Sequence, residues 1–428
     1  MSQNIKNLVQ KSLKKRKSKE LRFRLLGITS IGLALSFLLL LFVMLTSKGY
    51  GAFLHSKIKL ELDLTKEVIA ENSDMTNEEI ANISNSDLID KINYRRLIKK
   101  SLREKYPDAQ SIADINSLYQ LTSKIASLEL KEIIVKNPNL IGQKSELWLS
   151  TSSKVDIYFK HHQTSSLNEK QIEWIDKTIT QQEIKTAFNW QFFQFADSRE
   201  PEIAGIGAGL VGSIFVMLIF LSFAFPVGVM CAFYLEEFAP KNRITDIIEI
   251  SINNLAAIPS IIYGLLGLTV YLQFFHLPRS SSLVGGMTLF MLVLPVIIIA
   301  TRNTIRSIPN TIRDAAIGLG ASKVQIVLHH LLPLSIPGIM TGTILAISRA
   351  LGETAPLLMI GMIAFIADIP QSFLDPTTVL PVQIYLWSDS PEVGFAEKTS
   401  AAILVLLTML ILFNLIAVIL RKKFEKKW

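Results

Sequence analysis

Long apolar runs separated by short charged segments dominate this chain of 428 residues. Six runs hold few or no charged residues and reach, or come close to, the roughly 20 residues that a helix needs to cross a bilayer. They cover residues 25–47, 203–235, 250–278, 280–301, 331–367 and 399–420. The pattern predicts an all-α membrane protein with six transmembrane helices, and the last five form a core at residues 203–420.

Residues 48–202, between the first two runs, follow a different pattern and predict a small α+β domain. Residues 57–65 alternate strictly between apolar and polar positions, which is typical of a half-buried strand. The apolar face of this strand is Ile58, Leu60, Leu62 and Leu64. The same alternation recurs at Val155, Ile157 and Phe159, so a second strand is expected there.

Two helices and an aromatic exit complete the expected domain. Residues 87–105 and 167–178 have the spacing of amphipathic helices, the second with Trp174 on its apolar side. Residues 188–195 are rich in aromatic side chains and are expected at the membrane interface. The His161-His162 pair is interpreted as an exposed turn at the end of a strand. No spacing typical of a metal or cofactor site accompanies it, so none is expected.

The formal net charge of +8 has a distribution that indicates membrane orientation rather than a nucleic-acid partner. Basic residues concentrate in two tails, residues 1–24 and 421–428, which places both tails in the cytoplasm. An even number of spans agrees with this, and the loops after residues 235 and 301 carry further basic residues. Residues 48–202 are therefore expected outside the cytoplasm, and we call them the insertion domain.

The first apolar run predicts an anchor helix at residues 25–47 rather than a cleaved signal peptide. It is longer than the core of about 7–15 residues that signal peptides have, and no A-x-A site follows it. The only cysteine, Cys231, lies in the second run, so no disulfide can form within the chain.

The loop of residues 303–334, between the fourth and fifth runs, predicts two short helices at an angle. Asn310 or Thr311 is expected to cap the first helix, with Asp314 placed favourably near its start. Ala315 and Ala316 are small and would let a partner surface approach closely.

The second half of this 303–334 loop carries its own boundary signals. Gly320 permits a bend, and Ser322 to Gln325 form a capping box that opens a second helix. Pro333, after Leu332, is expected to end that helix. Spacing alone fits a docking element for a soluble partner and an amphipathic helix on the membrane surface equally well.

Two charges lie inside the fifth run. Arg349 and Glu353 are four residues apart, so in a helix they share a face and can pair. Because a charge at the bilayer centre costs at least about 2.5–3.5 kcal/mol on insertion scales, such residues usually mark a functional site. The pair either offers a passing oxyanion a guanidinium partner or only fixes helix packing.

Several neighbours extend this candidate pathway. Ser348, Thr343 and Thr354 can donate further hydrogen bonds. Pro226 and Pro259 are expected to break helices at membrane depth, where such breaks often line cavities. Arg302 and Arg306, near the inner mouth, either attract anions or act as positive-inside anchors. Small residues at 338, 342, 346 and 350 form a stripe that favours close helix packing.

The 303–334 loop resembles the ATPase-docking loop of ABC importer permeases. That motif reads E-A-A, three residues, G, nine residues, I-x-L-P. This chain has Asp314-Ala315-Ala316, Gly320, His330 and Leu332-Pro333 at those positions, so Asp314 replaces Glu and His330 replaces Ile. Further strings resemble the PstA family of phosphate-specific ABC permeases over residues 203–420. They are YLEE at 234–237, PSIIYGLLG at 259–267, LP at 294–295, RALGETAP at 349–356 and LPVQIYLW at 380–387.

The resemblance implies a type I importer permease in a bacterial inner membrane. It implies that residues 303–334 dock an ATPase dimer like PstB, that a second permease like PstC completes the path, and that an extracytoplasmic binding protein like PstS delivers phosphate. The chain has no G-x-x-x-x-G-K-[ST] motif, so a separate subunit would hydrolyse ATP. Two alternatives remain, a permease for sulfate or molybdate and a membrane sensor that uses the insertion domain.

Overall fold

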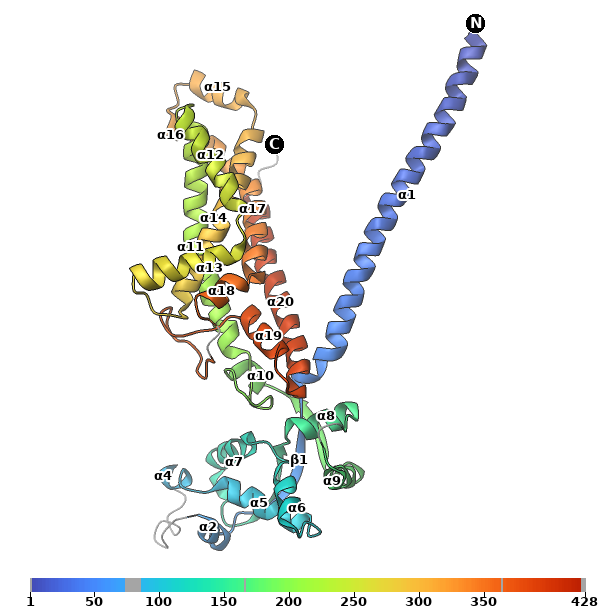
Figure 1. Ribbon diagram of the computed structural model, residues 1–428, viewed down its shortest axis with the longest axis vertical. Coiled ribbons are helices and arrows are strands. Elements are labelled where there is room, and N and C mark those ends of the chain that lie inside the picture. Colours follow the sequence, from blue (N-terminus) through green and yellow to red (C-terminus); the bar gives the residue numbers. More distant parts are fainter. Residues whose placement is uncertain (1, 74–85, 165–166, 363–364, 425–428) are drawn as a thin grey trace.

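The computed structural model describes residues 2–73, 86–164, 167–362 and 365–424. Within that part of the chain, five helices are long and apolar enough to cross a membrane, or six if one bent pair counts as a single span. One small sheet lies near the N-terminal end of the sequence. The predicted class, a helical membrane protein with an α+β insertion, is confirmed. The insertion domain lies at one end of the helical bundle and the 303–334 loop at the other (Figure 1).

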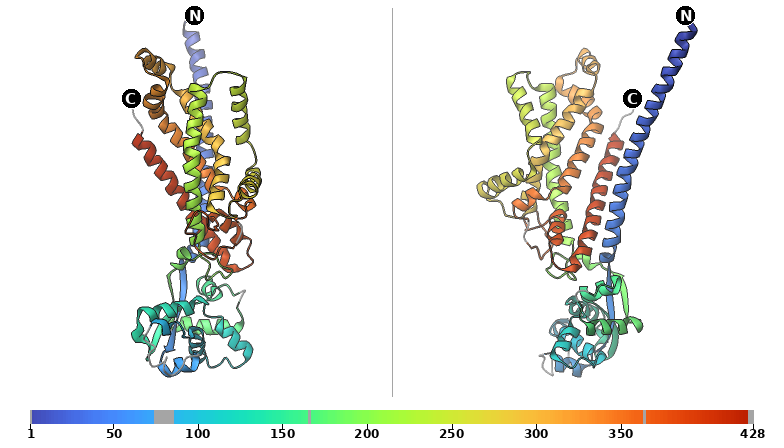
Figure 2. Two further views of the ribbon diagram at one scale, coloured as in Figure 1. Left: turned by 90° about the vertical axis from the view of Figure 1, so that its left-hand side faces the viewer. Right: turned by 45° about the vertical axis from the view of Figure 1, so that its right-hand side comes forward.

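The first helix, α1 (Ser2–Gly49), is continuous through the basic segment that was expected as a separate tail. Its apolar window is not buried against the rest of the described chain. Figures 1 and 2 show α1 on the outside of the bundle, close to α20 (Val393–Phe424) near the insertion domain. There Gly49 touches α20 so closely that an added Cβ would lie 2.6 Å from the backbone nitrogen of Ala401. Residues 425–428 of the C-terminal basic tail lie outside the described residues.

The insertion domain is built on a three-stranded antiparallel sheet. The central strand β1 (Leu54–Asp63) pairs with β2 (Lys144–Ser150) on one side and with β3 (Ile184–Phe188) on the other. The strand expected at residues 57–65 is therefore confirmed. Its four alternating apolar side chains are at most 3% exposed and form the centre of the domain core, because alternation puts all of them on one face.

Helices surround this sheet. They are α2 (Lys66–Asn72), α4 (Ser86–Ile89), α5 (Tyr94–Lys105), α6 (Ile112–Tyr119), α7 (Ile125–Lys136), α8 (Ser153–His161) and α9 (Glu169–Thr180), with 3-10 turns at Tyr50–Phe53 and Pro138–Leu140. The helix expected at 167–178 is confirmed as α9, and Trp174 is buried in the core. The short helix α10 (Gln191–Gln194) leads back toward the membrane core.

Two expectations for the insertion domain are wrong. The helix expected at 87–105 is interrupted, because the Asn93 side chain accepts a hydrogen bond from the backbone N–H of Arg96 and starts α5 anew. The strand expected around residues 155–159 is the helix α8, which also places His161 at a helix end. In that helix Lys160 pairs with Asp156 at 2.6 Å, an i,i+4 contact that a strand could not make.

Polar contacts join the insertion domain to the membrane core. Lys160 donates from Nζ to the backbone oxygens of Gly51 and Leu54, both at 2.7 Å. His161 Nε2 lies 3.3 Å from Oε1 of Glu397 on α20. The entry of the domain, its helix α8 and α20 therefore meet at one point.

The core packs helix against helix through small residues. Its long members are α11 (Gly207–Phe233), α14 (Ser282–Ser307), α17 (Leu332–Gly352) and α20. The expected small-residue stripe on α17 faces α14, where added Cβ atoms at Gly338 and Gly342 would clash with Thr304 and Ala300. This contact confirms the close packing that the stripe predicts.

The third apolar run is bent. It forms α12 (Arg243–Ala256) and α13 (Ser260–Gly267), the latter continued by a π-helical segment (Leu268–Phe274), with an angle of 102° between the two parts. Pro259 lies at the break, as expected, and the Tyr263 hydroxyl donates to the Leu255 carbonyl across it at 2.7 Å. Pro226, in contrast, lies inside a continuous α11, so the break expected there is wrong. Pro226 lies on the exposed face of α11, and its one missing N–H does not end a helix whose opposite face packs on α14 through Ala224 and Gly228.

The fifth span is shorter than expected. α17 ends at Gly352, well before residue 367, and the chain then forms α18 (Ala355–Met359) and, after an irregular segment, α19 (Leu380–Ser388). Pro356 accounts for the end of α17, because in a continuous helix its ring would clash with the carbonyl of Gly352. In the first turn of α18 its missing N–H costs nothing. Figure 1 shows α18 and α19 below the end of α17, within the bundle.

Candidate functional site

The Arg349–Glu353 pair forms where α17 stops. Arg349 lies in the last helical turn, and its Nε is 3.6 Å from Oε1 of Glu353. A cation at this position also favours the helix C-terminus, whose last carbonyls lack partners. Glu353 is outside the helix, with extended backbone angles (φ −80°, ψ 121°), so the expectation that both charges lie on one continuous helix is wrong.

The two charged side chains are accessible from outside this subunit. Arg349 is 36% exposed and Glu353 is 20% exposed, and Gly352 beside them has open space where a Cβ would stand. A charged pair at this depth needs water or a protein partner around it, because lipid cannot solvate it. The arrangement presents a guanidinium whose N–H donors are not all used by Glu353.

The hydroxyls expected near the pair are mostly engaged elsewhere. Ser348 exchanges hydrogen bonds with Asn414 of α20 at 3.2–3.4 Å. The Thr343 hydroxyl donates to the carbonyl of Ile339, one turn back on its own helix, at 2.9 Å. Thr354 precedes α18 without a side-chain capping bond and is partly exposed beside Glu353. Of the three, Thr354 is the best placed to join the pair.

A tight contact behind the pair holds its backbone in place. An added Cβ at Gly264 of α13 would lie 2.7 Å from the Cα of Pro356 and 2.8 Å from the Cβ of Met359. The bent third span therefore packs directly on the segment that follows Glu353.

The 303–334 loop forms a compact element at the opposite end of the bundle (Figure 1). It contains α15 (Asn310–Gly318), α16 (Lys323–Ile326) and a π-helical turn (Val327–Leu331) that runs into α17. The capping box between Ser322 and Gln325 is present, as expected. Gly320 adopts φ +84°, which makes the bend after α15.

Two details of this loop differ from expectation. Pro309, rather than Asn310 or Thr311, precedes α15, and Asn310 instead accepts a bond from Arg313. Pro333 does not end the second helix, because the chain passes through the wider π-turn and Pro333 occupies the first turn of α17, where no N–H is needed. Leu332, beside it, starts α17 and is partly buried.

The surface of α15 is apolar as well as charged. Asp314 and Ala315 are exposed, whereas Ala316 is 5% exposed and packs inward, contrary to the expectation that both alanines face a partner. Ile317 is 60% exposed and Leu319 is 90% exposed. Large exposed apolar side chains beside a charged residue are typical of a protein contact surface.

An ion-pair network links this end of the core together. Glu236 contacts Arg302 at 2.6 Å and Arg306 at 3.0 Å. Glu249 of α12 contacts the same two arginines at 2.7 and 3.2 Å. Both arginines are thus committed to carboxylates, which disfavours the idea that they attract anions.

A second ion pair fixes α15. Arg313 Nη2 lies 2.8 Å from Oε1 of Glu237, in the π-helical segment (Tyr234–Phe238) that continues α11. The same guanidinium donates to the carbonyls of Ile305 and Ile308 at the end of α14. Sequence reasoning noted the YLEE string but assigned its carboxylates no partner. Adjacent acidic residues at the end of an apolar run were the available signal.

Two family models match separate parts of this chain. Residues 224–428 match the family described as "Binding-protein-dependent transport system inner membrane component". Residues 10–169 match a family described only as a domain of unknown function, DUF3333. Among solved structures, the chain resembles one titled "Inward facing conformations of the MetNI methionine ABC transporter", at 15% identity and a TM-score of 0.40, covering 50% of this chain and 94% of that one.

Curated relatives share more of the sequence. The chain is 32% identical over 242 residues to the probable ABC transporter permease protein YqgI of Bacillus subtilis, which covers 53% of this chain and 81% of that protein. It is 30% identical over 222 residues to the phosphate transport system permease protein PstA of Yersinia pestis, which covers 51% of this chain and 73% of that one. Together with the apolar helices, these matches make it a multi-pass inner-membrane protein. The chain belongs to the binding-protein-dependent ABC importer permeases and is a PstA-like member of that family.

Proposed function

We propose that this chain is the PstA-like permease subunit of an ATP-driven importer of inorganic phosphate. The Arg349–Glu353 pair is the observation that carries the transport role, because it places a partly free guanidinium where a membrane helix stops inside the bundle. The names of its relatives, among them the PstA protein of Yersinia pestis, support phosphate as the solute.

The chemistry of the pair suits an oxyanion that must bind and then leave. A guanidinium binds phosphate through two parallel N–H donors. Glu353 competes for the same donors, so the anion is held weakly enough to be released. Thr354, beside Glu353, is a further donor to the passing anion.

The 303–334 loop would transmit the work of ATP hydrolysis. Asp314, Ala315, Ile317 and Leu319 form its exposed surface, and Gly320 shapes the bend behind them. A PstB-like ATPase dimer docking there would move α15. Arg313 and the π-turn would pass that movement to α11, α14 and α17.

The remaining partners follow from the same proposal. A PstC-like permease would cover the exposed face of the Arg349–Glu353 pair, and a PstS-like protein would deliver phosphate on the side of the insertion domain. Both ends of the chain would then be cytoplasmic, on the side of the 303–334 loop. The first turns of α1 and the last turns of α20 in Figure 1, which lie away from the insertion domain, support this orientation.

A second candidate solute is another tetrahedral oxyanion, sulfate or molybdate, because a guanidinium alone does not distinguish among them. Uptake of radiolabelled phosphate into cells that lack the chain, and into cells that carry it again, tests the proposal. Restored uptake that excess sulfate and molybdate do not inhibit supports phosphate. Uptake that either anion abolishes assigns the permease to that anion instead.

A further inference from the structure

A cavity lies where the insertion domain meets the entrances of two core helices. It has a volume of about 280 Å³, small for a drug-sized ligand and ample for a small anion with water. The start of α7, the start of α8 and one face of α5 line it, together with the segment before α11 and a residue just before α20. It is separate from the Arg349–Glu353 pair, none of whose residues line it.

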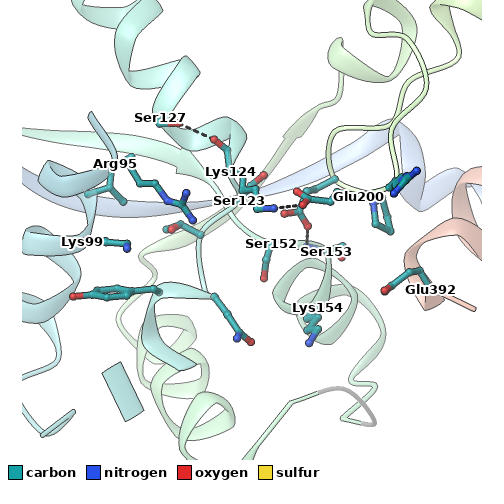
Figure 3. Close-up of a pocket in the computed structure, with 17 residues that line it drawn as sticks. Arg95, Lys99, Ser123, Lys124, Ser127, Ser152, Ser153, Lys154, Glu200 and Glu392 are labelled. Carbon is teal, nitrogen blue, oxygen red and sulfur yellow. Dashed lines mark hydrogen bonds and ion pairs between the residues drawn. The ribbon is translucent and has the colours of Figure 1, made fainter. Parts of the chain in front are cut away.

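Cations gather around this cavity from several elements. They are Arg95 and Lys99 of α5, Lys124 before α7, Lys154 of α8 and Arg199 in the segment before α11. Among the ion pairs of the described residues, only Lys124 of these five has a carboxylate partner. Figure 3 shows Arg95 and Lys99 on one side of the cavity and Ser152, Ser153 and Lys154 across from them. Positive groups without counter-ions on facing walls favour an anion between them.

A buried hydroxyl adds an unused polar group. Ser152 is 8% exposed, and within the described chain its Oγ has no hydrogen-bond partner. It is the residue before α8 and makes no capping bond there, although serine usually does so at this position. Because an unpaired buried hydroxyl is costly, its presence in a cavity wall points to a ligand that supplies the missing bond.

Three carboxylates, Glu200, Glu202 and Glu392, also line the cavity, and two of them already contact its donor groups. Glu200 pairs with Lys124, and Oε2 of Glu202 accepts a bond from the backbone N–H of Ser153 at 3.0 Å. Burial raises the pKa of the Glu202 carboxyl. Glu200 and Glu202 lie in the short segment that leads into α11. Lys124 and the backbone N–H of Ser153 in the insertion domain therefore already bind this segment.

We propose that this cavity binds a small phosphate-bearing anion, either inorganic phosphate or the phosphate group of a small ester. Arg95, Lys99 and Lys154 supply its positive donors and Ser152 a neutral one. Donors on different walls suit a tetrahedral group better than a planar carboxylate. The bound anion competes with Glu202 for the backbone N–H of Ser153 at the start of α8. Anion binding is therefore coupled to the segment that enters the membrane core.

Direct binding to the purified full-length chain tests this proposal. The chain, with Arg349→Ala to remove the proposed transport site, is placed in lipid nanodiscs and dialysed against radiolabelled phosphate or glucose 6-phosphate. We expect saturable binding of at least one of them, and the stronger ligand identifies the source of the phosphate group. Arg95→Gln with Lys99→Gln should weaken binding at least about tenfold, because two charge-assisted contacts are lost.

Two further variants separate binding from folding. Lys100→Gln, on the same helix but paired with Glu71 at 3.0 Å, should leave binding unchanged. Glu202→Gln should tighten binding, since it removes a competing charge while keeping an oxygen that accepts from Ser153. Absence of saturable binding, or equal binding by the Arg95/Lys99 double variant, overturns the proposal. Neither result bears on phosphate uptake, which depends on the Arg349–Glu353 pair and is measured in cells.

Discussion

Arg313 and Glu237 join the exposed helix α15 to the end of α11 through an ion pair of 2.8 Å, with both side chains less than a fifth exposed. The guanidinium also holds two carbonyls at the end of α14. One side chain therefore connects two elements of the core, α11 and α14, with the proposed ATPase-docking surface.

Replacing Arg313 with alanine should reduce ATP-driven phosphate uptake strongly. Breaking a largely buried pair by removing one partner costs about 3–5 kcal/mol, which is enough to release α15 from its position. Uptake in cells and the amount of ATPase recovered on purification of the chain measure this. Lys323→Ala, an exposed lysine in the same loop, is the matched control. Normal uptake by the Arg313 variant would contradict the mechanical role.

The two adjacent alanines of α15 should respond differently to cross-linking. Ala315 is exposed and Ala316 is buried, so a cysteine at 315 should be captured by the docked ATPase and a cysteine at 316 should not. Both variants need Cys231→Ser, because that residue is the only native thiol. Equal capture at both positions, or none at 315, would show that α15 docks in another way.

A polar change at Leu319 should weaken docking without disturbing the fold. This side chain is 90% exposed, so aspartate there costs the subunit little, whereas an apolar contact surface on a partner would have to desolvate the new charge. We expect the variant to reach the membrane in normal amounts. The amount of ATPase that co-purifies with it should fall at least about tenfold. Full retention would exclude Leu319 from the interface.

The Arg349–Glu353 pair allows a charge-swap experiment. Arg349→Ala with Glu353→Ala should abolish uptake and leave the subunit assembled. The exchange Arg349→Glu with Glu353→Arg should restore part of it, because a guanidinium again lies beside a carboxylate. Undiminished uptake by the double alanine variant would leave the pair with only a packing role.

The buried His55 predicts a pH dependence of stability. Burial is the main reason that its pKa falls from 6.5 to about 4, although Asp156 and Glu129 oppose the shift while Lys160 and Lys398 add to it. Between these two values the unfolded chain binds the proton and the folded chain does not. The free energy of unfolding should therefore fall as pH falls through this window, by up to about 1.4 kcal/mol per pH unit from this group.

Thermal unfolding of the detergent-solubilised chain from pH 7.5 to 4.5 measures the effect. His55→Gln should flatten the dependence, whereas His329→Gln, an exposed histidine in the 303–334 loop, should leave it unchanged. An unaltered slope in the His55 variant would mean that other groups dominate acid destabilisation.

Two alternating patterns of different length had different outcomes in the insertion domain. The strand around Leu60 was found because alternation over nine residues fits only one structure. Three alternating positions from Val155 to Phe159 fit a strand and a helix face alike, and the Asp156–Lys160 contact favoured the helix. The end of α17 is hidden from the hydropathy pattern, because apolar residues continue to Ala367 on the far side of Pro356, whose ring ends the helix.

In the candidate site, contacts between residues close in sequence could be predicted, and contacts between distant residues could not. Arg349 and Glu353 are neighbours in sequence, so their pairing could be predicted from spacing. The contacts of Arg302 with Glu236, 66 residues apart, depend on how α11 and α14 pack, which no local pattern encodes. The cavity around Ser152 likewise combines segments from across the insertion domain.

The contacts of Lys160 and His161 have a mechanical consequence. Since α8 contacts both the backbone at Gly51 and Glu397 near the start of α20, the insertion domain is not joined to the membrane helices by a flexible linker alone. The domain is instead fixed to the last membrane helix. A force applied to it from outside would therefore be transmitted to the membrane-spanning helices.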